Sequence, residues 1–595
     1  MSGAYEKKRG ADLVSEDTTV LRRFAVLISG VGFGLIALSV ASFLGLVSVT
    51  SELMGVSVYQ MLGSGTLFAG FGVTLLSGAS RFGYMETSPD EFGGVLPAVI
   101  LGPLWFVVAG LIASEMFGMS MPVWLGVALV IGGFSTVAVL FTREDIGTMV
   151  PVSALLFLFG AAVVTGVMGP DWIWEPDTLD AVFPASVAVP GVSIILGLLA
   201  SWTASKAHAG FGAVGRQRGA RVLISTVAAG MMTVLLILVA FVASRGAGVV
   251  LENMTLGSGT LAVVTGLVAL VVGWRTGILS SLLARKLEPR RMPVTVAFFG
   301  LLSSVSVASV VLFVTGTQVG AYGATLVPEI AFSWPFVMNP SQGLGIQVGV
   351  MPAVLGTFWL VLGAVLFAVP LAVGAAVYLA EYASDSKFAS AVEVATNGLW
   401  STPSIVFGLF GLAFLIPRFG NNKSIFAGQL VLGFMLLPLT LITSYESMKS
   451  VPDAYRDASA ALGVTQWQTI RSVVIPAAMP GVVTGVILGV GRIAGETAPL
   501  LLVTGGANFP TAAPGVLSGF EFDVMASPPF VSVTNDALMQ AASALPYQLY
   551  AIITAGVGQN EEFGWGTALV LLGVVLSFYA IGIASRNYFR RKLNK

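Results

Sequence analysis

The feature that most constrains this chain is a series of long apolar runs without charge. Runs of roughly 18 or more residues recur along the sequence, and each is long enough to cross the hydrocarbon core of a bilayer as a helix. Charged residues make up only 10% of the 595 residues, whereas soluble domains typically carry about 25%. The sequence therefore predicts an all-α, polytopic helical membrane protein. Its net charge of −1 provides no basic field for binding nucleic acid.

About fourteen transmembrane helices are expected from the lengths of these runs. The run from Phe24 to Thr50 exceeds the roughly 7–15 apolar residues of a signal peptide, so we assign it as the first span. Most of the 29 lysines and arginines then fall on one side, which predicts a cytoplasmic tail over residues 1–23 and a cytoplasmic C-terminus. The predicted spans are 24–49, 60–79, 94–114, 122–141, 149–168, 188–205, 222–243, 255–275, 295–316, 351–373, 396–417, 425–445, 480–505 and 565–585.

The polar segment Leu282–Arg291, with the sequence LLARKLEPRR, predicts a boundary between two parts. Before it, residues 24–285 form a membrane extension of about eight spans with short connections and an unknown role. After it, residues 286–595 hold the other spans, with a cytoplasmic loop at 446–479 and a long outer region at 506–564.

The cytoplasmic loop contains the sequence SVPDAYRDASAALGVTQWQTIRSVVIP, which predicts two short helices joined by a turn. Ser450 can cap the first helix, and Gly463 suits its end. Thr465 and Gln468 form a capping-box pattern for the second helix, which Pro476 should end. From composition alone, this hairpin could equally dock in a groove on a partner protein or rest on lipid headgroups.

The same segment resembles the EAA loop of ABC-importer permeases. In that loop a Glu-Ala-Ala triplet precedes a glycine and, about ten residues later, an Ile-x-Leu-Pro ending. The matching residues here are Asp457, Ala458, Ser459, Gly463, Ile475 and Pro476. Asp for Glu and Ser for Ala are conservative departures. Because the loop inserts into a cleft on the ATPase subunit in that family, the resemblance implies a docking role for this segment.

Two charged residues fall inside the predicted span 480–505. Arg492 lies about twelve residues in, roughly 18 Å along the helix, and Glu496 follows at i+4 on the same face. Each charge costs roughly 2.5–3.5 kcal/mol at the centre of a membrane helix, so the pair should face a bundle interior or an aqueous path. The guanidinium could bind an oxyanion, helped by Thr497 and by backbone groups that Pro499 leaves free. Alternatively, the two charges form an ion pair that simply holds helices together.

Four sequence blocks closely resemble the A-type permease (PstA) of phosphate-specific importers. The first block is Arg492-Ile-Ala-Gly-Glu-Thr-Ala-Pro-Leu-Leu, which matches the signature of that family. The other three are YLAEY at 378–382, STPSIVFGLF at 401–410 and ALPYQLY at 544–550.

This resemblance covers about residues 290–595 and implies a six-helix ABC type I importer permease core. It also implies that Arg492 and Glu496 are the pair critical for transport. Two features depart from the family: the stretch Phe509–Gln540 looks inserted, and the N-terminal extension has no counterpart in the ordinary subunit.

The resemblance further implies the partners of the chain in a prokaryotic cell (plasma) membrane. These are a second permease (PstC type), two ATPase subunits (PstB type) that bind ATP and Mg, and an extracellular phosphate-binding protein (PstS type). The sequence contains no Gly-Lys dipeptide and hence no G-x-x-x-x-G-K-[ST] loop, so a separate polypeptide must hydrolyse ATP. We expect no cofactor, metal ligand or catalytic residue in this chain.

Two alternatives remain open. Arginine recognises sulfate, molybdate and phosphate alike, so the core could import another oxyanion. An ion-coupled secondary transporter would need buried ionisable residues, and the N-terminal spans contain almost none. The extension alone could act as a scaffold or sensor that contacts the importer.

Overall fold

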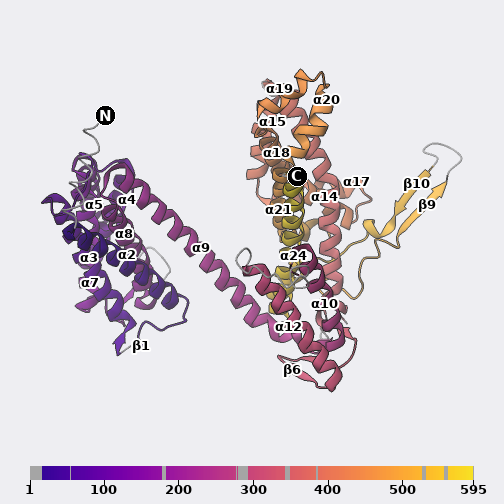
Figure 1. Cartoon of the computed structure of the whole chain (residues 1–595), viewed down its shortest axis with the longest axis horizontal. Coiled ribbons are helices and arrows are strands. Elements are labelled where there is room, and N and C mark those ends of the chain that lie inside the picture. The colour runs from indigo at the N-terminus through magenta and orange to yellow at the C-terminus, as the bar shows by residue number, and fades with distance from the viewer. Residues whose placement is uncertain are drawn as a thin grey trace. The chain divides into compact units, whose positions relative to one another are not determined.

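The computed structural model describes residues 16–593, apart from 54, 177–181, 277, 279–292, 342–348, 384–385, 525–530 and 555–560. Helices dominate it (Figure 1). Among the described residues, 13 helices are long and apolar enough to cross a membrane, and a bent pair allows up to 14 spans. The prediction of an all-α polytopic protein with about fourteen spans is therefore confirmed.

The chain forms two compact units, Met1–Leu236 and Ile237–Lys595, which divide within helix α9. The helices of unit 1 are α2 (Glu16–Phe43), α3 (Val58–Arg81), α4 (Val95–Leu111), η2 (Ile112–Met116), α5 (Met121–Phe141), α6 (Glu144–Gly147), α7 (Met149–Val164), α8 (Ala185–His208) and the first part of α9 (Gly212–Leu251). Its two short hairpins pair β1 (Glu52–Leu53) with β2 (Val56–Ser57) and β3 (Ile173–Trp174) with β4 (Phe183–Pro184).

The helices of unit 1 pack in nested pairs: α2 against α8, α3 against α7 and α4 against α5. Glycines allow the backbones of α2 and α8 to approach each other closely. A Cβ atom added to Gly32 on α2 would lie 2.6 Å from the carbonyl oxygen of Gly197 on α8, and one added to Gly197 would lie 2.7 Å from that of Gly32. Larger residues would separate the two helices, as expected where small residues mediate packing between membrane helices.

Buried charges connect the start of α6 to the last turn of α8 and the start of α9. Lys206 Nζ lies 2.8 Å from Glu144 Oε1, and both side chains are buried. The backbone N–H of Gly212 donates to Glu144 Oε2 at 2.9 Å. Beside them, Arg143 donates to both carboxylate oxygens of Asp145 at 3.1 and 2.9 Å. The sequence analysis missed this network because Glu144 and Lys206 lie just beyond the ends of the predicted spans.

Replacing Lys206 with methionine should destabilise unit 1 by about 3 kcal/mol, because the buried Glu144 carboxylate would lose its buried cation and keep only Arg216, whose Nη1 lies 3.7 Å from Glu144 Oε2. Thermal unfolding of the purified chain in detergent measures the loss. The double variant Lys206→Met/Glu144→Gln should recover most of it. A single variant as stable as the native chain would contradict a buried ion pair at this position.

Unit 2 contains the rest of α9 and all later elements. Its helices are α10 (Ser258–Thr276), α12 (Pro293–Thr315), α13 (Pro335–Met338), α14 (Met351–Glu381), α15 (Lys387–Ser401), α16 (Ser404–Phe410), η3 (Gly411–Leu415), α17 (Ile416–Arg418), α18 (Ile425–Lys449), α19 (Asp453–Ala461), α20 (Gln466–Thr469), η4 (Ile470–Val474), α21 (Ile475–Ala494), α22 (Ala498–Val503), η5 (Asp536–Met539), α23 (Leu545–Ile553) and α24 (Glu561–Leu593). Its strands are β5 (Thr255–Gly257), β6 (Val319–Ala321), β7 (Ala324–Val327), β8 (Phe332–Ser333), β9 (Phe520–Val524) and β10 (Val531–Asn535).

The centre of unit 2 consists of α14 packed on α18, with α21 between α18 and α24. We call the end that carries α19 and α20 the loop end, and the end that carries β5–β8 the strand end. The stretch Phe509–Gln540 contains the antiparallel pair β9–β10, which projects away from the helices of this unit (Figure 1).

A four-stranded sheet joins the chain before residue 285 to the chain after it. The strand order is β6-β7-β5-β8, so β5 is an internal strand that pairs in parallel with β7 and antiparallel with β8. Trp334 Nε1 also donates to the carbonyl oxygen of Val250 near the end of α9, at 2.6 Å. The predicted boundary segment Leu282–Arg291 lies outside the described residues, and the predicted division at residue 285 stays a prediction.

Candidate substrate and coupling sites

Two helices of unit 2 are interrupted where the sequence predicts single spans. α15 and α16 are bent by 100° across Thr402 and Pro403. Thr402 has φ −69° and ψ 131°, the extended conformation that a following proline favours. Residues 495–497 separate α21 from α22. As continuous helices, the predicted spans 396–417 and 480–505 are therefore wrong.

The two interruptions lie side by side. α16 packs on α22, where a Cβ atom added to Gly408 would come within 2.7 Å of Pro499 Cα. The ring of Trp400, near the end of α15, lies 5.1 Å from Arg492 Cζ, near the end of α21. Interrupted membrane helices leave backbone groups that only protein or an aqueous cavity can satisfy, and such breaks form substrate sites in many transporters.

Arg492 occupies the last turn of α21 rather than the middle of a span. The apolar helix that carries it runs from Gln466 to Ala494, so it begins well before the predicted start at residue 480. Arg492 Nε lies 3.8 Å from Glu496 Oε1, which is longer than a hydrogen bond. No acceptor among the described residues takes an N–H of this guanidinium, and the side chain is 38% exposed.

Glu496 and Thr497 lie within the break that follows α21. The Glu496 side chain is 18% exposed, and Thr497 is half-buried. The structure thus brings the predicted residues Arg492, Glu496 and Thr497 together, while their role in transport stays a prediction. Trp400 was missed, although it directly precedes the block STPSIVFGLF that we singled out in the sequence.

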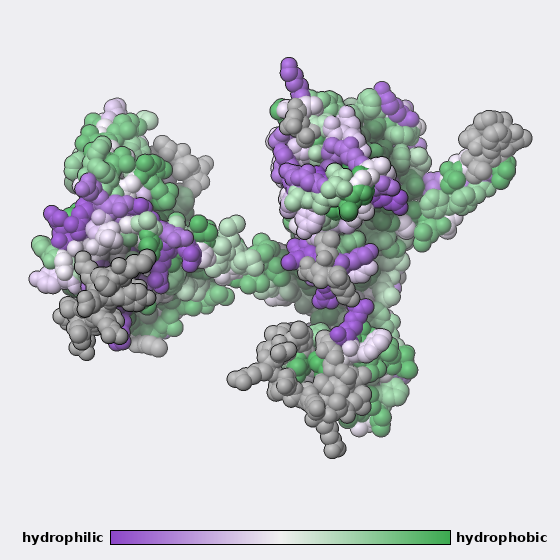
Figure 2. Space-filling view, turned by 45° about the horizontal axis from the view of Figure 1, so that its top comes forward, coloured by the Kyte–Doolittle hydropathy of each residue, from purple (hydrophilic) through white to green (hydrophobic). Residues whose placement is uncertain are grey.

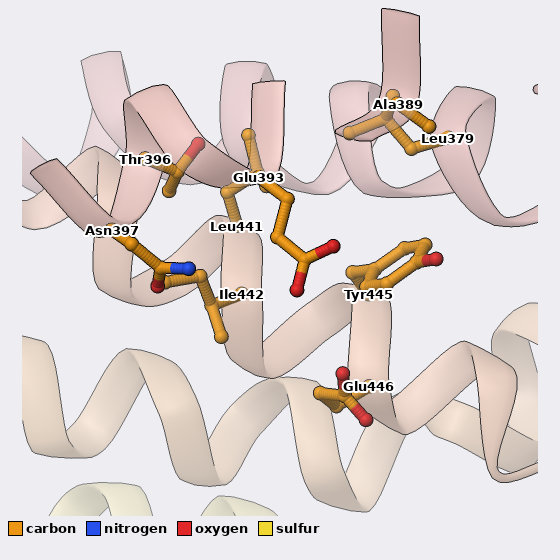
Figure 3. A pocket seen from close by; sticks show the side chains of 9 residues that line it. All are labelled: Leu379, Ala389, Glu393, Thr396, Asn397, Leu441, Ile442, Tyr445 and Glu446. Carbon is orange, nitrogen blue, oxygen red and sulfur yellow. The ribbon is translucent and has the colours of Figure 1, made fainter. Parts of the chain in front are cut away.

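A small cavity of about 40 Å³ lies between α14, α15 and α18, towards the loop end. Glu393 points into it from α15, towards the part of α18 that carries Tyr445 and Glu446 (Figure 3). The space suits one or two water molecules rather than a tetrahedral oxyanion. Its two carboxylates would also repel an anion, so Arg492 is the better candidate for binding one.

The loop segment forms two short helices on either side of a glycine, as predicted. Gly463 has φ +74°, the left-handed conformation that suits a residue just after a helix. The predicted capping box is present: the Thr465 side chain accepts the N–H of Gln468, and the Gln468 side chain accepts the N–H of Thr465.

Two details of the loop differ from the prediction. Ser450 caps the end of α18 instead of the start of α19. Pro476 does not end a helix, because α20 continues through η4 into α21. The π-helical turn η4 ends two residues before Pro476 and accommodates a residue that cannot donate to the helix ladder.

Most of the predicted coupling residues are accessible. Asp457, Ala458, Gly463 and Pro476 are exposed, Ile475 is half-buried and Ser459 is buried. Hydrophilic residues gather at the loop end (Figure 2), yet three large apolar or aromatic side chains of the loop itself are exposed. They are Tyr455 (58%), Leu462 (82%) and Trp467 (57%). Exposed apolar groups bordered by polar ones are typical of a protein-binding surface.

An ion pair fastens the loop to another helix. Arg456 on α19 donates to both carboxylate oxygens of Glu381, at 2.7 and 3.3 Å, and to the carbonyl oxygens of Val451 and Met448. Gln466 Nε2 donates to the carbonyl oxygen of Glu381. Glu381 is the last residue of α14 and its side chain is only 6% exposed. The hydrogen bond that Arg456 donates to Glu381 raises the pKa of Arg456 above its ordinary value, so the guanidinium of this clamp stays charged over any physiological pH range.

Comparison with known proteins locates the relatives of this chain in its C-terminal part. Residues 368–595 match the family described as binding-protein-dependent transport system inner membrane component. The probable ABC transporter permease protein YqgI of Bacillus subtilis (strain 168) is 30% identical over 43% of this chain and 85% of its own length. The phosphate transport system permease protein PstA of Xylella fastidiosa (strain 9a5c) is 33% identical over 38% of this chain and 71% of its own.

A third relative is the phosphate transport system permease protein PstA 1 of Mycobacterium tuberculosis (strain CDC 1551 / Oshkosh). It is 34% identical over 40% of this chain and 69% of its own length. The resemblance to PstA-type permeases is thereby confirmed. The matched region contains the predicted coupling loop and both interrupted helices. The chain belongs to the family of binding-protein-dependent inner membrane components, the permease subunits of ABC importers.

Proposed function

We propose that this chain is the A-type permease subunit of an ATP-driven importer for inorganic phosphate and forms half of its translocation path. The observation that carries the proposal is the guanidinium of Arg492. It is partly exposed between two interrupted helices, and no described residue accepts its N–H groups. A planar fork of charged donors suits an oxyanion. The choice of phosphate is supported by the names of the PstA relatives.

In this proposal the loop end lies on the cytoplasmic side of a prokaryotic cell membrane. There the segment 450–476 docks on a PstB-type ATPase, one of two that bind ATP and Mg. A PstC-type permease supplies the other half of the path, and a PstS-type protein delivers phosphate from outside. Support comes from the exposure of Asp457, Ala458 and Gly463 and from the clamp between Arg456 and Glu381.

Glu496 serves to restrain Arg492 between transport events. Its carboxylate lies 3.8 Å from Arg492 Nε, close enough for attraction but too far for a hydrogen bond. An incoming phosphate can therefore take the N–H groups without first breaking a strong ion pair. Because Glu496 lies in the break between α21 and α22, a small movement of that break would change its distance from the guanidinium.

Arg492→Gln should lower phosphate uptake by about 100-fold or more, since two charge-assisted hydrogen bonds contribute roughly 1.5–3 kcal/mol each. The measurement is ATP-dependent phosphate uptake by the complete importer in proteoliposomes, with ATP hydrolysis followed in parallel. Arg418→Gln is a matched control, because Arg418 also lies over an aromatic ring, that of Phe414. The importer with this variant should transport phosphate normally.

Two results would overturn the proposal. Normal uptake by the assembled Arg492→Gln importer would remove the oxyanion role of this residue. Uptake that needs an ion gradient but no ATP would favour a secondary transporter.

A further inference from the structure

We infer that Trp400 is a positioning residue for phosphate transport: its ring holds the guanidinium of Arg492 so that the N–H edge faces the anion. This inference rests on the proposed function of Arg492. It adds a residue from a second helix to a site that otherwise lies on α21 and the break that follows it.

The geometry of the pair leaves the donors of Arg492 free. Arg492 Cζ lies 5.1 Å from the centroid of the Trp400 ring, within the roughly 6 Å at which a cation is attracted by a ring face. A cation–π contact uses the face of the ring rather than a hydrogen-bond acceptor, and no described residue accepts an N–H of this guanidinium. The ring therefore restrains a long, flexible side chain without competing for its hydrogen bonds.

The helix end that carries Trp400 has hydrogen bonds of its own. Two hydroxyl groups secure the end of α15, because Ser401 Oγ and Thr402 Oγ1 each donate to the carbonyl oxygen of Gly398 at 2.9 Å. α15 ends at Ser401, and Pro403 prevents it from continuing. The helix packs along α18. Trp400 is thus carried by an ordered helix end, and a movement of α15 against α21 would change how Arg492 is held.

A simpler explanation is that Trp400, which is 41% exposed, only anchors α15 at the membrane surface. Such a role would affect folding, assembly and the ATPase together. A positioning role predicts a different pattern, in which ATP is hydrolysed but less phosphate is moved in each cycle. Phenylalanine retains a ring face. The variant Trp400→Phe should therefore transport phosphate nearly as well as the native importer if the role is positioning, but not if the residue only anchors α15.

The test uses the complete importer in proteoliposomes and measures phosphate transported per ATP hydrolysed. Trp400→Leu should lower this ratio by about 3- to 30-fold, the range that corresponds to loss of a cation–π contact. Its ATPase rate should stay within about twofold of the native rate, and Trp400→Phe should retain most of the ratio. Trp274→Leu provides a matched control, since Trp274 is 79% exposed on α10, whose main packing partner is α12.

The outcomes separate this inference from the proposed function. If Arg492→Gln transports normally, the proposed function fails. If Arg492→Gln fails but Trp400→Leu keeps the native ratio, only the inference fails. Parallel loss of uptake, ATPase and assembly in Trp400→Leu would assign a structural role and also overturn it. The double variant Trp400→Leu/Arg492→Gln should transport no less than Arg492→Gln alone, because the two side chains act through one contact.

Discussion

A chain carrying Gly463→Asp should insert and accumulate normally but support almost no uptake. A Cβ atom added at Gly463 would meet nothing within 4 Å, and aspartate tolerates the left-handed conformation better than most residues. The substitution should therefore leave the fold of the loop intact. If residues 457–463 fit inside a groove on the ATPase, however, the new carboxylate would be buried there without a partner. We expect copurification of the ATPase and ATP-driven uptake to fall by at least about tenfold.

Gly420→Asp is the matched control for this experiment. Gly420 also has a left-handed φ, +83°, and also has nothing within 4 Å of an added Cβ, but it lies after α17 rather than in the loop. The control should bind the ATPase and transport phosphate at nearly the native rate. If the Gly463→Asp importer bound the ATPase and transported phosphate as well as the control does, Gly463 would face solvent in the assembled importer.

Removing residues 1–285 should prevent stable accumulation of the remaining chain, whereas removing residues 1–211 should not. The shorter deletion keeps α9, β5 and α10. The longer one removes β5 and leaves β7 and β8 without the strand between them. It also removes Val250, which packs with Phe336 and Phe563 in one apolar cluster. Unpaired strands and exposed apolar surface favour misfolding.

Both truncated chains should be expressed with the other importer subunits and compared by protein level and by assembly. The first six predicted spans are absent from both, so the comparison isolates the segment from α9 to α10. Equal accumulation would show that this segment is dispensable for folding. Uptake by the shorter deletion would further show that residues 1–211 are not needed for translocation.

The number of spans and the position of most of them could be predicted because length and hydrophobicity alone decide whether a helix can cross a membrane. The interruptions could not. Pro403, Gly495 and Pro499 were visible in the sequence, but prolines also occur inside intact helices here, as Pro370 does in α14. Whether such a residue breaks a helix depends on the neighbours that satisfy the freed backbone groups. Those neighbours are far away in the sequence.

The candidate site was predicted only as far as local patterns reach. Spacing brought Arg492 and Glu496 together, and the capping box at Thr465 could be read directly. The contact of Trp400 with Arg492 and the clamp between Arg456 and Glu381 were not predicted, because each depends on contact between separate helices. Glu381 lay within a block that we had already singled out, yet a single sequence gives no indication of which cation it meets.

The clamp between Arg456 and Glu381 gives the loop a second mechanical connection. Along the chain, the loop continues through η4 and α21 to Arg492. Through the ion pair, it also contacts the end of α14. α14 is 31 residues long, roughly 46 Å of stiff helix. Near its far end, Thr357 Oγ1 accepts the N–H of Leu545. A movement of α19 would therefore be transmitted both to the strand end and to Arg492, the proposed anion-binding residue. Under that proposal, opening at the strand end and release of the anion need not occur one after the other.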